Sequence, residues 1–211
     1  MPVYVLSKDI VFPPVEFAES DGLLAIGGDL QVERLLLAYN SGIFPWYSEG
    51  EPICWYATNP RFVLFPAEFK RTKSLTKLYA SGRYHIRMNT CFEVVLESCA
   101  SVYRFGQNGT WITDEMKQAY TKLHKMGIAQ SVEVYNDAGI LCGGLYGLLL
   151  GSVFAGESMF SKESNTSKLA LFHLCSTQKL EVIDCQVYTE HLSSLGARMI
   201  PLQEYLQILN K

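Results

Sequence analysis

Gly143-Gly144-Leu145-Tyr146-Gly147 and the later Gly156-Glu157-Ser158-Met159-Phe160-Ser161 are the stretches that decide the fold of this chain. Both belong to apolar, glycine-punctuated runs, a pattern typical of buried β-strands. The pair of runs ends at a lone carboxylate, Glu157. A later β-like run contains a second carboxylate, Asp184, in the motif Asp184-Cys185-Gln186. A carboxylate on an apolar strand costs free energy unless it is paired or used, so this region is the first candidate for chemistry.

Strands and helices alternate outward from this centre. We predict strands at residues 61–65, 84–88, 130–135, 140–146, 152–155, 181–187 and 197–200. Helices are predicted at residues 72–81, 91–99, 114–126 and 165–178, with a turn at 191–196 before a last strand and helix. A hairpin through Asn136-Asp137-Ala138-Gly139 makes antiparallel pairing the centre of the sheet. The predicted fold class is α/β (α+β) with a mixed, largely antiparallel sheet.

A small N-terminal domain is predicted to precede this sheet, with residues 1–62 in the first domain and residues 63–211 in the second. The first domain contains a predicted helix at 32–40. Asp29 is placed to cap the start of that helix, and Gly42 follows its end, where a left-handed residue is favoured.

Aromatic side chains are unusually dense in G-I-F-P-W-Y at residues 42–47 and C-W-Y at 54–56. This segment is either a small core beneath a long loop or a stacking platform for a base or another flat ligand. Trp111 presents a similar choice, because it stands just before a helix whose predicted N-cap is Thr113. A helix N-terminus can hold an anion beside the ring, whereas the alternative is a buried anchor.

The composition indicates a globular protein, because 48% of the 211 residues are hydrophobic and 18% are charged. The sequence contains no apolar run of membrane-spanning length and no signal-peptide pattern, so we expect a cytoplasmic protein. The six cysteines form no C-x-x-C pair, and no histidine stands at metal spacing from them. This favours reduced core thiols and no metal site.

The formal net charge of −3 argues against non-specific coating of nucleic acid, which needs a basic surface. It does not exclude a nucleic acid that is gripped at one end. The chain is locally basic at Lys70, Arg71, Lys73 and Lys77, with Arg83 and Arg87 beyond them. This segment is either an ordinary solvated face or a patch that contacts phosphates.

Eight short motifs occur in one order along the chain. They are G-G-D-L at 27–30, G-I-F-P-W at 42–46, G-T-W-I at 109–112, S-V-E at 131–133, the two opening stretches, D-C-Q at 184–186 and S-L-G-A at 194–197. In this order and spacing they resemble the bacterial leucyl/phenylalanyl-tRNA-protein transferases. The family pattern extends beyond Lys211, and its segment between the Glu157 and Asp184 motifs is longer, so the resemblance carries no residue role into Lys168 to Lys179.

The resemblance implies a GNAT acyltransferase fold for the second domain. It also implies an enzyme, an aminoacyltransferase that moves Leu or Phe, and Met less well, from aminoacyl-tRNA to the α-amine of proteins beginning with Arg or Lys. That transfer marks the acceptor for degradation by the N-degron route. The implied partners are aminoacyl-tRNA and such proteins, and we expect no cofactor, no metal, no membrane and a monomer.

The reaction, aminolysis of an ester, needs little acid–base machinery, because an α-amine with a pKa of about 8 is partly neutral near pH 7. The enzyme must align the reactants, remove one proton and stabilise an oxyanion. On a strand Asp184 and Gln186 share one face while Cys185 points to the other, which disfavours a cysteine nucleophile. The resemblance assigns Gln186 to accept a hydrogen bond from the amine and Asp184 to orient or polarise it. Glu157 is a co-candidate for the proton, and a buried structural role is the alternative for both carboxylates.

The donor side chain should bind in an apolar pocket, for which the nearest apolar residues are Leu145, Phe154, Met159 and Leu171. Apolar pockets discriminate weakly by volume, which suits an enzyme that accepts several side chains. The family's positions suggest that Trp46 and Trp111 stack the terminal adenine of the tRNA. Tyr39 and Tyr120 would then offer hydroxyls to ribose or phosphate.

Two other functions stay open at this point. A small-molecule N-acyltransferase that uses acetyl-CoA would need a glycine-rich pyrophosphate loop leading into a helix, whereas residues 143–156 are strand-like and apolar. A non-catalytic module for tRNA ends is the second, and the presence of Glu157, Asp184 and Gln186 argues against it.

Overall fold

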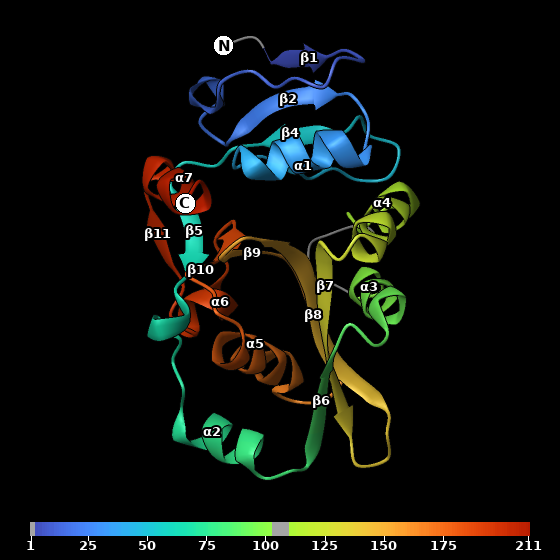
Figure 1. The fold of residues 1–211 in the computed structure, drawn as a ribbon, viewed down its shortest axis with the longest axis vertical. Helices are drawn as coiled ribbons and strands as arrows, with labels where there is room; N and C mark the ends of the chain where they lie inside the picture. Colours follow the sequence, from blue (N-terminus) through green and yellow to red (C-terminus); the bar gives the residue numbers. More distant parts are fainter. Residues whose placement is uncertain (1–2, 103–109) are drawn as a thin grey trace.

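The computed structural model describes residues 3–102 and 110–211, and a seven-stranded sheet forms its centre (Figure 1). The strand order is β11-β5-β10-β9-β8-β7-β6. Neighbouring strands are antiparallel except β9 and β10, which are parallel. The predicted mixed, largely antiparallel sheet is therefore confirmed. Its strands are β5 (Arg61–Leu64), β6 (Tyr84–Met88), β7 (Ala129–Asn136), β8 (Leu141–Leu150), β9 (Val153–Ser161), β10 (Val182–Gln186) and β11 (Arg198–Ile200).

Helices cover both faces of this sheet (Figure 1). Helix α5 (Thr166–Thr177) packs on one face, while α3 (Phe92–Ala100) and α4 (Asp114–Lys125) pack on the other. Because side chains alternate along β8, Leu145 packs in the cluster with α5 and Tyr146 in the cluster with α3 and α4. Close approach of α5 requires glycine in β8, since a Cβ on Gly143 would lie 2.3 Å from Thr166 Oγ1.

Shorter helices complete this part of the chain: α2 (Lys73–Ala80), α6 (Glu190–Ser194), α7 (Leu202–Leu209) and one 3₁₀ turn (Pro66–Glu68). The predicted turn at 191–196 was wrong for most of its length, because α6 occupies it. Thr189 caps this helix by accepting the backbone N–H of Leu192 at 3.2 Å. A helix of one turn is too short to leave a periodic signal in the sequence. Within the two described ranges, none of the helices has the length and apolar character to cross a membrane.

A four-stranded sheet in the order β1-β2-β4-β3 forms the N-terminal part, together with helix α1 and a 3₁₀ turn. Helix α1 has the predicted bounds, but Asp29 does not cap it, because Gln31 is the N-cap and Asp29 pairs with Arg34 at 3.3 Å. One continuous hydrophobic core joins α1 to α4 and the large sheet. The division at residues 62/63 stays a prediction. The elements are β1 (Tyr4–Leu6), the turn Val15–Phe17, β2 (Leu23–Gly27), α1 (Val32–Asn40), β3 (Phe44–Pro45) and β4 (Cys54–Tyr56).

The parallel strands β9 and β10 separate near their ends. Their ladder ends at Ala155 and Asp184. Just beyond, the register of β9 with β8 shifts around Glu157, and the register of β10 with β5 shifts between Asp184 and Gln186. An extra residue in a strand bends it and redirects its side chain. A crevice therefore opens between the strands, and Glu157 lies within β9 instead of at the end of the shorter strand that we predicted.

Candidate active site

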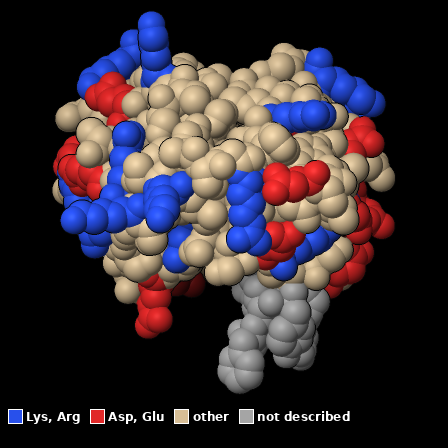
Figure 2. Space-filling model, turned by 90° about the horizontal axis from the view of Figure 1, so that it is seen from below, with Lys and Arg blue, Asp and Glu red and all other residues tan. Residues whose placement is uncertain are grey.

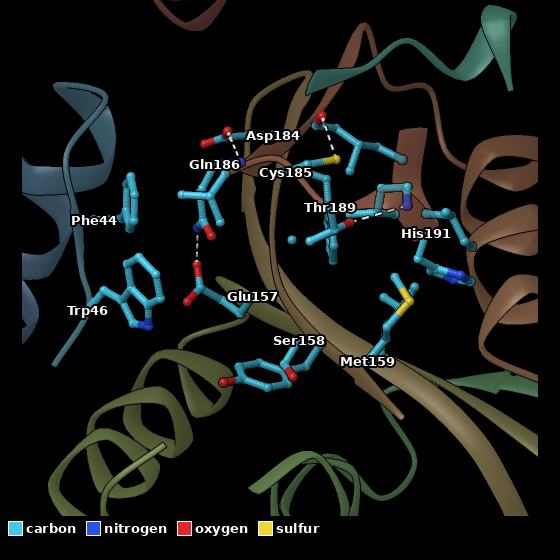
Figure 3. Close-up of a pocket in the computed structure, with 18 of the residues that line it drawn as sticks. Phe44, Trp46, Glu157, Ser158, Met159, Asp184, Cys185, Gln186, Thr189 and His191 are labelled. Carbon is cyan, nitrogen blue, oxygen red and sulfur yellow. Dashed lines mark hydrogen bonds between the residues drawn. The ribbon is translucent and has the colours of Figure 1, made fainter. Parts of the chain in front are cut away.

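A cavity of about 350 Å³ occupies this crevice (Figure 3). Its wall is mainly apolar, and its polar groups lie where β9 and β10 separate. Tyr39 and Tyr120 lie behind the wall, whereas the other residues predicted for the site line the cavity. These are Trp46, Trp111, Leu145, Phe154, Glu157, Met159, Leu171, Asp184 and Gln186.

Glu157 is the carboxylate on the β9 side of the cavity. Its Oε1 accepts from Gln186 Nε2 at 2.7 Å and from the Tyr39 hydroxyl at 2.8 Å, and its Oε2 accepts from the Tyr120 hydroxyl at 2.9 Å. Burial raises the pKa of Glu157 to about 7, although the three hydrogen bonds act in the opposite direction. A carboxyl group that titrates near neutral pH is suited to accept a proton and return it.

Tyr39 and Tyr120 are placed differently from the expectation. Tyr39 comes from α1 and is 2% exposed, and Tyr120 comes from α4 and is fully buried. Their hydroxyls contact Glu157 and each other. Burial raises the pKa of both phenols well above the ordinary value. Because these hydroxyls bond Glu157 and neither tyrosine lines the cavity, their expected contact with ribose or phosphate stays a prediction.

Gln186 has an unusual backbone conformation at the end of β10. Its φ of 62° lies in the left-handed region, which costs a residue with a side chain about 1–3 kcal/mol. Its backbone N–H donates to Asp184 Oδ1 at 3.0 Å, and its carbonyl accepts from Thr58 Oγ1 at 3.0 Å. Its side-chain Nε2 donates to Glu157, so the amide oxygen is the atom that remains to accept from an incoming amine.

Asp184 acts on the backbone of Gln186 and not on its side-chain amide. The carboxylate is fully buried. It accepts hydrogen bonds from Nε and Nη2 of Arg61, each at 2.8 Å, and from the Tyr205 hydroxyl at 3.0 Å. Such a bidentate pair fixes the geometry of both partners. The orienting role expected of Asp184 is thus possible through the peptide N–H, whereas direct polarisation of the amide is not what this geometry provides.

Arg61 is a neighbour of the site that the sequence analysis missed. Its guanidinium carbon lies 4.7 Å from the ring centre of Phe44 and 4.9 Å from that of Tyr205. Phe44 lies on β3 beside Trp46, so this guanidinium connects the strand that leads to Trp46 with β10. A signal was present, because Arg61 opens one apolar run and Asp184 interrupts another. Opposite charges on two apolar strands indicate a buried pair.

The aromatic segment divides between the two interpretations left open by its sequence. Phe44, Tyr47 and Trp55 are buried in the core, whereas Trp46 is 38% exposed at the rim of the cavity (Figure 3). Trp111 packs partly against the core and also lines the cavity. The motif that contains it begins at Gly109, which lies outside the described residues.

The apolar wall is larger than predicted. Thr189 and His191 add polar groups to the wall (Figure 3). Burial and the charge of Lys168 lower the pKa of His191, which favours its neutral form near pH 7. The apolar residues that join the four predicted ones include Leu174, Ile183, Cys185, Val187 and Leu192.

Burial raises the pKa of the Cys185 thiol, which argues further against a cysteine nucleophile, and all six cysteines are free thiols.

The basic segment runs from the residues just before α2 to β6, and none of its residues is among those that line the cavity. Arg71, Arg83 and Arg87 pack over the rings of Phe172, Tyr84 and Tyr135. Figure 2 shows Lys and Arg side chains interspersed with Asp and Glu on the face that carries these elements. The solvated face and the phosphate-contacting patch therefore both remain open.

Comparisons with known proteins agree on one family. The family model described as leucyl/phenylalanyl-tRNA protein transferase matches residues 63–210, and the model of its N-terminal domain matches residues 28–59. A leucyl/phenylalanyl-tRNA–protein transferase of Syntrophus aciditrophicus is 52% identical, covering 100% of this chain and 89% of that protein. One of Flavobacterium johnsoniae is 53% identical, covering 98% and 99%.

Two solved structures are also similar to this chain. FemX has a TM-score of 0.48 at 11% identity, and the match covers 85% of this chain and 71% of that one. L-PGS from Bacillus licheniformis has a TM-score of 0.39 at 10% identity, and the match covers 78% of this chain and 55% of that one.

Proposed function

The chain belongs to the leucyl/phenylalanyl-tRNA-protein transferase family and is an aminoacyltransferase, and from this premise we propose its substrates. The donor is aminoacyl-tRNA carrying Leu or Phe, and less well Met. The acceptor is the α-amine of a protein that begins with Arg or Lys. The transfer would feed the N-degron route in the cytoplasm, with the enzyme acting as a monomer.

One observation carries this proposal. A single cavity combines an apolar wall, two indoles and the hydrogen-bonded pair of Glu157 and Gln186. The apolar wall suits the side chain of Leu, Phe or Met, which it would distinguish mainly by volume. Trp46 and Trp111 would stack the terminal adenine of the tRNA, and their position in the wall of the cavity supports this role. A mildly acidic protein can hold tRNA in this way, because it grips one nucleotide and one side chain.

The acceptor amine would approach Gln186 and Glu157. The amide oxygen of Gln186 accepts one N–H and orients the nitrogen toward the ester carbonyl. Attack forms the C–N bond, and one proton passes to Glu157. When the ester C–O bond breaks, the ribose oxygen leaves with that proton, and Glu157 returns to the carboxylate form. The charge of Glu157 also favours an acceptor with a cationic first side chain.

The acetyl-CoA alternative finds no support in the geometry, because the glycines of residues 143–156 lie in β8, in β9 and in the turn that joins these strands, and not in a loop before a helix. Membership in a transferase family likewise favours an enzyme over a non-catalytic tRNA-binding module.

A transfer assay tests the proposal. Phe-tRNA and a peptide beginning with Arg should give a product with Phe added to its N-terminus, and a peptide beginning with Lys should behave alike. The same peptide with an acetylated α-amine is the matched control, because it keeps the side chain and lacks the nucleophile. Failure to form product above the no-enzyme level would exclude the proposed reaction. Equal transfer to peptides beginning with Glu would exclude the proposed acceptor preference.

A further inference from the structure

Tyr39, Tyr120 and Glu157 make three mutual contacts. Each hydroxyl lies within hydrogen-bond distance of one carboxylate oxygen, and the two hydroxyls also bond each other. Each phenol carries one hydrogen, so an ionised Glu157 leaves two hydrogens for three contacts. Either one carboxylate contact or the contact between the phenol oxygens must then go without a hydrogen.

A proton on Glu157 completes the set. Oε2–H donates to Tyr120, Tyr120 donates to Tyr39, and Tyr39 donates to Oε1, so that each contact has one hydrogen. Gln186 donates to Oε1 in both states, which keeps the amide oriented while the proton is held. All three ring members are buried, so an unfilled contact is costly and a closed network is favoured.

We infer that Tyr39 and Tyr120 are positioning residues that close a hydrogen-bonded ring around the proton which Glu157 accepts during transfer. The inference rests on the proposed function for the origin of the proton and deepens it by assigning the two tyrosines. The ring closes when the amine gives up its proton and opens when the ribose oxygen takes that proton away. One turnover therefore leaves the ring unchanged.

Other titratable groups face the ring from the neighbouring strands. Asp184 on β10 raises the pKa of Glu157 by its charge, and that charge is itself paired with Arg61 on β5. Tyr146 on β8 packs edge-on against Tyr120, with 5.7 Å between the ring centres. Helices α1 and α4 contribute the ring tyrosines themselves. Variants of the two hydroxyls therefore change the ring while these groups stay in place.

Tyr39→Phe and Tyr120→Phe each break the ring. Each also removes one of the two phenol oxygens that lie together without a hydrogen between them when Glu157 is ionised. We expect the acid limb of the kcat profile to move to lower pH by about one unit, a tenfold change in the ionisation constant of Glu157. The KM for aminoacyl-tRNA should not change, because both hydroxyls bond Glu157 and neither tyrosine lines the cavity. Both constants are measured across the neutral pH range with Phe-tRNA and a peptide beginning with Arg.

Tyr205→Phe is the matched control, because it removes a buried hydroxyl 3.0 Å from the other carboxylate, Asp184. It should leave the midpoint of the acid limb where it is. If the midpoint of the acid limb moves to higher pH in the two tyrosine variants, each hydroxyl acts only as a separate donor that stabilises the ionised carboxylate. If the midpoint does not move and the KM for aminoacyl-tRNA rises, the hydroxyls contact the nucleotide instead. Either result overturns the ring.

Infrared difference spectroscopy of the protein without substrate gives a second readout, in which the protonated carboxyl of Glu157 is titrated and Glu157→Gln serves as the blank. A downward shift of the midpoint in both tyrosine variants supports the ring even if the transfer assay fails. Normal transfer by the wild type with an unmoved carboxyl midpoint in the variants overturns the ring and leaves the proposed function intact.

Discussion

Glu157 and Asp184 are buried carboxylates on neighbouring strands, and their surroundings offset the cost of burial in opposite ways. Asp184 meets a charge, the guanidinium of Arg61, in a bidentate pair. Glu157 meets neutral donors, two phenols and an amide, and burial raises its pKa to about 7. A charge-paired carboxylate is suited to hold a backbone, whereas one among neutral donors can exchange a proton. The partners of a buried charge therefore indicate its task.

The largest effect should follow from breaking the charged pair. Arg61→Met leaves Asp184 buried without its cation and should lower the free energy of unfolding by about 3–5 kcal/mol. Urea denaturation measures this loss. Arg34→Met is the matched control, because Arg34 is also buried but its partner Asp29 is 37% exposed and can be hydrated. Equal losses in the two variants would contradict the special role assigned to the Asp184 pair.

The second effect is a pH dependence that belongs to Glu157. Its pKa is about 7 in the folded protein and 4.5 ordinarily, so the folded state binds this proton more tightly. The carboxyl group is protonated in both states below pH 4.5, stability falls as pH rises from 4.5 to 7, and the full difference of about 3 kcal/mol is lost above pH 7. Urea denaturation of the wild type and Glu157→Gln across this range measures the difference.

Glu163 supplies the opposite sign for comparison. Hydrogen bonds from Asn136 and Tyr84 lower the pKa of this partly buried carboxylate, so its contribution to stability is present above its ordinary pKa and is lost as pH falls. Glu163→Gln should therefore change the acid side of the stability curve and leave the neutral side alone. A neutral-range slope that survives in Glu157→Gln would refute the assignment to Glu157.

A third test asks whether the binding of aminoacyl-tRNA depends on groups other than the carboxylates of Glu157 and Asp184. Trp46→Ala removes a rim side chain that is 38% exposed and should raise the KM for aminoacyl-tRNA about 10- to 100-fold, the loss of about 1–3 kcal/mol of stacking. The KM for the acceptor peptide and the pH profile should not change. Steady-state kinetics with each substrate varied in turn measure all three. Equal effects on donor and acceptor would count against adenine stacking.

The smallest effect concerns the backbone that Asp184 holds. Gln186→Gly removes the bond to Glu157 but also relieves the left-handed strain at φ 62°, so stability should change by less than about 1 kcal/mol. Chemical denaturation measures the change, and Asn165→Gly, at φ 67°, is a control for strain relief away from the site. A loss of several kcal/mol would show that the side chain, and not Asp184, holds this turn.

Much of this architecture was predictable, because its causes are local. Alternating apolar runs predicted the strands of the large sheet, and side-chain caps such as Thr113 predicted where helices begin. Nine of the residues predicted for the site also line one cavity, since motifs on neighbouring strands converge where the strands separate.

The rest depended on contacts between distant segments. No local pattern shows that the hydroxyls of Tyr39 and Tyr120 point at Glu157, because packing of α1 against α4 decides it. The left-handed conformation at Gln186 could not be predicted from the sequence, because this position is not a glycine. Arg61 was predictable in principle, but only by comparing the charges of two apolar strands that are distant in the sequence.

The contact between Tyr39 and Glu157 spans 118 positions of the chain. During synthesis α1 emerges long before β9, so the proposed proton-accepting group is incomplete until β9 has left the ribosome. An interrupted chain would therefore lack the environment that raises the pKa of Glu157. A copy truncated before β9 would lack Glu157 itself, and with it the carboxylate that we propose as the proton acceptor.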